Sequence, residues 1–163
     1  HDALTSREEL ITRGAISAEH YDEAARIAAR LFAAGQAWAS TRGLILVDTK
    51  YEMGLDADGR IVVIDEIHTP DSSRYWIADG YEQRFAKGED QRMLDKENIR
   101  QWLIREHGFS GQGKPPPLSD DVRVMLATKY IEVFERLTGQ TFASAVGSVA
   151  DRIQANLEAK GYL

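Results

Sequence analysis

LILVDTKYEMGLDADGRIVVIDEIHTPDSSRYW, residues 44–76, is the stretch of sequence that decides the fold. Its first part, Leu44–Met53, begins with apolar, partly β-branched residues and then alternates between charged and less polar positions, which is typical of a β-strand. Asp56–Gly59 has turn chemistry, because glycine tolerates positive φ and aspartate bonds nearby backbone N–H groups. The apolar run Ile61–Ile64 then returns as a second strand. We therefore expect an antiparallel hairpin.

The charged positions of this hairpin are expected to lie on one face. If Leu55 pairs with Arg60 across the turn, Lys50 lies opposite Asp65, because directly paired residues of antiparallel strands share a face. Glu52 then lies diagonally beside that pair. The resulting patch holds four charged residues: Asp48, Lys50, Glu52 and Asp65.

Two interpretations of this patch stay open from spacing alone. Crowded carboxylates repel unless a cation separates them, and Mg²⁺ prefers carboxylate oxygen, so the patch fits a metal site with a lysine beside it for phosphate or carboxylate. A solvated hairpin face with surface ion pairs has the same pattern. His68 follows in the loop, where we expect a solvent-exposed histidine.

A longer motif favours the first interpretation. Residues Leu46–Gly54, LVDTKYEMG, resemble a signature of the SAICAR synthetase (phosphoribosylaminoimidazole-succinocarboxamide synthase) family, which has phenylalanine where this chain has Met53. Asp65-Glu66 and Thr69–Trp76 resemble the family's next block. The segments 95–103 and 129–139 resemble its longer form, so the resemblance extends over nearly the whole chain.

The resemblance implies an enzyme: an ATP-dependent carbon–nitrogen ligase of purine biosynthesis. It joins L-aspartate to carboxyaminoimidazole ribonucleotide (CAIR), giving SAICAR, ADP and phosphate, with ATP and Mg²⁺ as cofactors. By the same resemblance, Glu52 and Asp65 hold Mg²⁺–ATP, and Asp48 and Lys50 act in catalysis. The substrate-binding residues it implies are Asp71, Arg74 and Arg100, the two arginines holding the ribose phosphate.

The composition is compatible with such an enzyme and excludes several other classes. The chain has 163 residues, 43% of them hydrophobic, which is enough for one domain with a sizeable core. Its net charge of −6 and lack of a basic cluster argue against nucleic-acid binding. It has no cysteine, so disulfides and thiolate chemistry are excluded. No membrane span or targeting segment is visible, and we expect a cytoplasmic protein.

Helices are expected on both sides of the hairpin, which makes the fold class α+β, a hairpin or small sheet packed with several helices. We treat residues 1–163 as a single domain with a Gly/Pro-rich connector near 109–118. Ser72 is expected to cap a short turn containing Arg74 and Trp76. Serine caps and glycine stops predict helices at 6–14, 17–43 and 119–139, the last with a buried apolar stripe. Glycine stops also end expected helices at 79–88 and 96–108, and a final helix with apolar residues is expected at 143–160.

One part of the family pattern has no counterpart here. Nothing in the chain resembles the family's N-terminal ATP-covering lobe, so we expect that lobe to be supplied in cis or in trans and the 163 residues alone to be inactive. A different class stays open, namely a non-catalytic nucleotide-binding or assembly module that keeps the family's helical half.

Overall fold

The computed structural model describes residues 4–94 and 97–163, and the resembling positions Asp95 and Lys96 lie outside them. Two small antiparallel sheets follow two helices and precede four more within the described residues, so the fold is α+β, as expected. The elements in chain order are α1 (Arg7–Thr12), α2 (Ala18–Ser40), β1 (Leu44–Thr49), β2 (Met53–Leu55), β3 (Ile61–Val63), β4 (Ser73–Ile77), α3 (Tyr81–Lys87), α4 (Glu97–His107), α5 (Asp120–Thr138) and α6 (Val149–Ala159).

The helix starts follow the serine pattern of the sequence. The hydroxyl of Ser6 accepts a hydrogen bond from the backbone N–H of Glu9 at 3.1 Å, which satisfies one of the free N–H groups of the first turn. The same bond recurs at Ser17, Ser119 and Ser148. The predicted starts of α1, α2 and α5 are therefore confirmed, whereas the Ser148 cap of α6 was not predicted.

The central strand pair is β1 with β4, and this corrects two expectations. Leu44 pairs with Ile77 and Thr49 with Ser73, so the segment after Ser72 is a strand and not a capped turn. β1 also ends at Thr49, so Leu44–Met53 is not one continuous strand. The segment 50–52 carries the chain from the first sheet to the second. Long-range pairing thus overrides the local hairpin signal here.

The predicted hairpin exists in a shorter form and in a different register. β2 pairs with β3 so that Leu55 lies opposite Ile61, not Arg60. The side chain of Asp56 closes the turn by accepting hydrogen bonds from the N–H groups of Asp58 and Arg60, both at 2.9 Å, and Gly59 has φ +78°. The turn chemistry is confirmed, but a one-residue shift in pairing reverses which side chains share a face.

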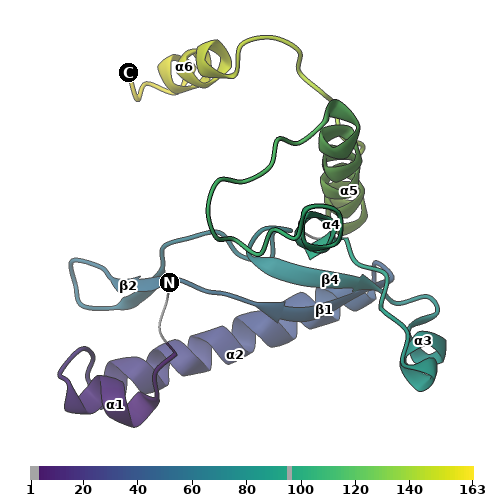
Figure 1. Ribbon diagram of the computed structural model, residues 1–163. Helices are drawn as coiled ribbons and strands as arrows, with labels where there is room; N and C mark the ends of the chain where they lie inside the picture. Colours follow the sequence, from purple (N-terminus) through teal and green to yellow (C-terminus); the bar gives the residue numbers. More distant parts are fainter. Residues whose placement is uncertain (1–3, 95–96) are drawn as a thin grey trace.

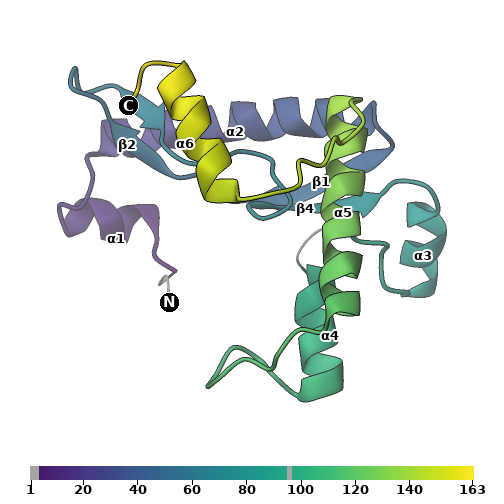
Figure 2. The ribbon, with the colours of Figure 1, turned by 90° about the horizontal axis from the view of Figure 1, so that it is seen from above.

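The core lies between α2, the β1–β4 pair and α5. α2 runs along β1, and α5 meets the C-terminal end of α2, where Trp38 donates its indole N–H to the carbonyl of Leu137 at 2.8 Å (Figures 1 and 2). Seven buried apolar residues form one cluster: Ala39, Leu44, Leu46, Tyr75, Ile77, Leu94 and Val133.

The C-terminal helices are more exposed than the core elements, and α5 is less buried than its apolar stripe predicted. Phe134 of α5 is 38% exposed, although Val133 beside it is fully buried. α6 begins at Val149, six residues later than expected, and lies away from the sheets (Figure 1). Every residue of α6 is exposed, including Ile153 and Leu157. The spacing of apolar residues in the sequence identified the apolar face of α6, but it did not show that this face is exposed. No helix in the described residues is long and apolar enough to cross a membrane.

The difference between core and C-terminal leucines can be measured. Leu44→Ala should lower the free energy of unfolding by about 2–5 kcal/mol, because the truncation leaves a cavity at a site that is 1% exposed. The matched change Leu157→Ala should cost only roughly 0.5 kcal/mol, since that side chain lies on the exposed α6. Urea denaturation of both variants checks this, and equal losses would contradict the described core.

Candidate functional site

A polar cavity of about 470 Å³ lies where β1 and β4 meet the loop 64–72 and helix α4. Its wall contains four carboxylates and three cationic side chains, so ligand groups of either sign can be held there. It brings together all the site residues predicted from the sequence except Glu52. The lining residues are Asp48, Thr49, Lys50, Asp65, Glu66, Asp71, Ser72, Ser73, Arg74 and Arg100.

A β-bulge aims Asp48 into this cavity. The register of β1 against β4 shifts between Leu46, which pairs with Tyr75, and Asp48, which pairs with Arg74. In a regular strand Asp48 would share a face with the buried Leu46, because side chains alternate with a period of two. The extra residue, Val47, moves Asp48 to the opposite face, where Arg74 lies.

Asp48 and Arg74 form a two-point ion pair across the strands. The Arg74 Nε–H lies 2.9 Å from each carboxylate oxygen of Asp48, and its Nη2 donates to Oδ2. The guanidinium beside it lowers the pKa of the Asp48 carboxyl, which therefore stays ionised at neutral pH. About half of each side chain is exposed, so the pair orients the guanidinium at the cavity surface without burying it.

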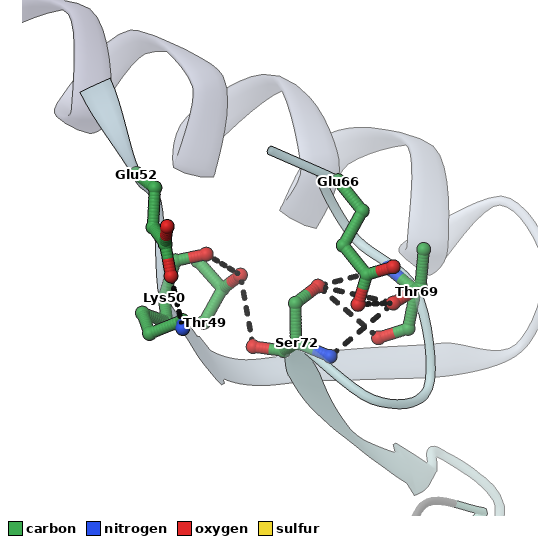
Figure 3. Close-up of polar contacts among 6 residues, drawn as sticks. All are labelled: Thr49, Lys50, Glu52, Glu66, Thr69 and Ser72. Carbon is green, nitrogen blue, oxygen red and sulfur yellow. Dashed lines mark hydrogen bonds and ion pairs between the residues drawn. The ribbon is translucent and has the colours of Figure 1, made fainter. Parts of the chain in front are cut away.

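Lys50 and Glu52 form a second pair at the edge of the cavity. The Lys50 Nζ lies 2.5 Å from the Glu52 carboxylate (Figure 3). The expected cross-strand contact of Lys50 with Asp65 does not arise from hairpin pairing, because Lys50 donates its backbone N–H to Ser72 and Glu52 accepts from Ile64. Asp48, Lys50 and Asp65 do meet at the cavity, but through β1 and the loop 64–72 that precedes β4, while Glu52 lies at its edge.

The loop 64–72 is tied together around Thr69 (Figure 3). The Thr69 hydroxyl donates to the carboxylate of Glu66 at 3.0 Å and accepts from the backbone N–H groups of Asp71 and Ser72 at 3.3 and 3.2 Å. The Ser72 hydroxyl in turn accepts from the Thr69 N–H at 3.2 Å. This network holds the cavity wall in one shape.

Sequence reasoning did not assign site roles to Glu66, Thr69 or Ser72. The sequence feature that indicates the turn is the motif Thr69–Ser72, because Ser and Thr hydroxyls next to a proline favour compact turns.

His68, expected to be exposed, is partly buried. Its Nε2 lies 2.7 Å from the hydroxyl of Tyr51, and its carbonyl accepts a hydrogen bond from the hydroxyl of Tyr75 at 2.6 Å. Burial lowers the pKa of the His68 imidazole. It raises the pKa of the Tyr51 hydroxyl, and it raises the pKa of Tyr75 to about 12. The side chains of His68, Tyr51 and Tyr75 are therefore neutral at physiological pH.

Arg100 reaches the cavity from a different element. It lies in α4, whose residues Trp102 and Leu103 are half-buried. Arg74 and Arg100 therefore reach the same cavity from a strand and a helix that lie far apart in the chain.

The donor set of the cavity suits a hard cation. Among residues 4–94 and 97–163, no group of three or more His, Asp or Glu side chains is placed to hold a metal ion by itself. Mg²⁺ needs fewer protein ligands when phosphates and water complete its octahedron. Asp65 lies in the cavity wall and Glu52 at its edge, so carboxylate oxygens, the ligands that Mg²⁺ prefers, are present at this cavity.

A second, less polar cavity of about 370 Å³ was not predicted. It lies between the start of α2 and the β2–β3 hairpin, and its lining includes Ser17, His20, Met53 and Ile61.

Comparisons with known proteins identify the family to which this chain is similar. The SAICAR synthetase family profile matches residues 1–116. The phosphoribosylaminoimidazole-succinocarboxamide synthase of Legionella pneumophila (strain Lens) is 44% identical over 160 residues, which cover 97% of this chain and 51% of the relative. That of Cytophaga hutchinsonii is 47% identical over 144 residues, 87% of this chain and 46% of the relative.

Solved structures give the same result. A SAICAR synthetase in complex with ADP superposes with a TM-score of 0.61 at 27% identity, over 88% of this chain and 48% of that one. The Saccharomyces cerevisiae SAICAR synthase complexed with SAICAR superposes with a TM-score of 0.61 at 33% identity, over 73% and 38%. This chain spans about half the length of the curated relatives it matches, and it belongs to the SAICAR synthetase family.

Proposed function

We propose that this chain forms the substrate-binding part of an ATP-dependent ligase that joins L-aspartate to CAIR, giving SAICAR, ADP and phosphate. The observation that carries the proposal is the cavity in which Arg74 and Arg100 converge beside Lys50 and four carboxylates. The named ligands of two solved relatives, ADP and SAICAR, are the nucleotides such a site would serve.

The two arginines would hold the ribose phosphate of the imidazole nucleotide. A guanidinium offers a planar fork of N–H donors that matches phosphate oxygens. Asp48 already occupies the Nε and Nη2 side of Arg74, which fixes the plane of the fork toward the cavity. Asp71 lies in the same wall and would contact the substrate's polar groups.

Lys50 and Asp48 would act at the reacting carboxylate. That carboxylate is a poor electrophile until it takes the γ-phosphoryl group of ATP, which makes an acyl phosphate; the amine of aspartate then displaces phosphate and loses a proton. Lys50 would neutralise the charge that gathers on the oxygens, and Asp48 would orient the cationic groups around it.

Glu52 and Asp65 would hold Mg²⁺ with ATP. The ion would neutralise phosphate charge during transfer. In this arrangement Lys50, which contacts Glu52 at 2.5 Å, lies between the metal side and the substrate side of the cavity.

The complete ligation is proposed for the whole protein. Phosphoryl transfer requires ATP to be enclosed and aligned with the acceptor, and an open site leaves the acyl phosphate exposed to water. Since this chain spans about half of its relatives, the remaining half of their length would cover ATP. A soluble biosynthetic enzyme of this kind would work in the cytoplasm.

Arg74→Ala should weaken binding of SAICAR by about 10- to 100-fold, the loss expected when a charge-assisted bond to phosphate is removed. Isothermal titration of the 163-residue chain with SAICAR measures this. Arg123→Ala is the matched control, because Arg123 is an exposed residue of α5 outside the cavity. Equal affinities of the wild type and Arg74→Ala would remove the phosphate-binding role of Arg74.

Glu52→Gln should reduce the Mg²⁺-dependent part of ADP binding by about tenfold or more. Changing a residue that merely supports a metal ligand typically lowers metal affinity by that factor, and Glu52 is proposed to be a ligand itself. The measurement is ADP titration with and without Mg²⁺. Glu82→Gln, an exposed position of α3, should leave both titrations unchanged. If Mg²⁺ strengthens ADP binding equally in Glu52→Gln and wild type, Glu52 is not a metal ligand.

A further inference from the structure

The backbone of His68 is strained. Its φ is +59°, the left-handed region, and it is the one non-glycine residue with positive φ in the part of the chain that the structure describes. This conformation costs a residue with a Cβ about 1–2 kcal/mol and persists only where surrounding contacts enforce it. The position therefore needs strong local contacts.

Three contacts from different parts of the chain hold His68 in this conformation. The imidazole Nε2 is hydrogen-bonded to Tyr51, just after β1, and the carbonyl is hydrogen-bonded to Tyr75 of β4. On its remaining side the ring lies against α2 at Gly35, where a Cβ would come within 2.4 Å of the imidazole Cε1 and 2.8 Å of Nε2. Leu46 closes the same place, with its Cδ2 2.8 Å from that Cβ position.

Gly35 is the position in α2 that leaves room for this ring. Glycine inside a helix is unfavourable by roughly 0.5–1 kcal/mol relative to alanine. Gly35 is nevertheless fully inside α2 and buried. The space that it leaves open is filled by the His68 ring, so the helix gives up stability at the point where the loop docks.

The docked residue is directly joined to the centre of the cavity wall. Thr69, the next residue, is hydrogen-bonded to Glu66 and Ser72 (Figure 3) and also to the backbone N–H of Asp71. Its carbonyl accepts the N–H of Ser73 at 2.9 Å, where β4 begins. A displacement of His68 would therefore move Thr69 and the residues bonded to it.

We propose that His68 is a positioning residue of the cavity: its imidazole, seated against Gly35 and bonded to Tyr51, fixes the loop 64–72 so that Asp65 and Asp71 hold their places in the wall. The effect on the loop follows from the contacts of this chain alone. The effect on nucleotide binding rests on the proposed function.

Amide hydrogen exchange of the 163-residue chain tests the loop directly. In His68→Ala, the N–H groups of Asp71, Ser72 and Ser73 should exchange about tenfold faster or more, while amides of α5 keep their rates. His20→Ala is the matched control, since His20 is a half-buried histidine of α2 outside the loop and its polar cavity. Unchanged exchange of the three amides in His68→Ala would overturn the proposal.

Two milder variants keep the test decisive if His68→Ala does not fold. Tyr51→Phe removes only the hydroxyl that bonds the ring and should speed exchange of the same amides. Gly35→Ala should do so too, although alanine favours the helix, because its Cβ displaces the ring. Exchange of these amides at the wild-type rate in both variants would show that the His68 ring does not hold the loop.

Titration with SAICAR separates this proposal from the proposed function. At a temperature where all variants are folded, His68→Ala should bind SAICAR about tenfold more weakly and His68→Gln, which keeps a polar group within reach of Tyr51, should recover part of the loss. Faster loop exchange with unchanged SAICAR affinity would limit His68 to a structural role. Failure of the wild type to bind SAICAR would contradict the proposed function. The hydrogen-exchange rates would still test whether His68 holds the loop 64–72.

Discussion

The antiparallel pairing of β1 with β4, with its bulge at Val47, is the constraint on which the rest of the structure depends. It sets the two faces of the strand pair. Leu44 and Leu46 face the core with Tyr75, and Asp48 faces the cavity with Arg74. A strand that buries alternate residues cannot place a carboxylate two positions after a buried leucine without a cost in desolvation, and the bulge removes that conflict. The core and the site thus share two strands without sharing a face.

The loop 64–72 depends on the same strand pair. It leaves β3, docks His68 between α2 and the two tyrosines, and returns as β4 at Ser73. Its polar groups are bonded to one another through Thr69, so the cavity wall is ordered before any ligand binds. Preorganisation of this kind lowers the entropy lost on binding and favours accurate placement of charged substrates.

Much of this could be predicted from the sequence, and the failures have a common cause. Serine caps and the Asp56–Gly59 turn are local signals, and the structure confirms them. The partner of β1 could not be found locally, since β4 lies more than twenty residues away and the intervening turn suggested a nearer partner. An alternating sequence pattern does not reveal the bulge at Val47. Apolar periodicity likewise does not reveal whether another element covers the apolar face of α6. The site residues were found through the family motif Leu46–Gly54 and the later blocks 65–76 and 95–103, which do not depend on the strand register, but their roles stay predictions.

The central claim is that the cavity formed by β1, β4, the loop 64–72 and α4 holds the imidazole nucleotide. A crystal structure of the chain grown with SAICAR tests it most directly. The account predicts density for the ligand in this cavity, with its phosphate within hydrogen-bonding distance of the guanidinium groups of both Arg74 and Arg100. SAICAR bound instead between the start of α2 and the β2–β3 hairpin, or with its phosphate away from both arginines, would contradict it.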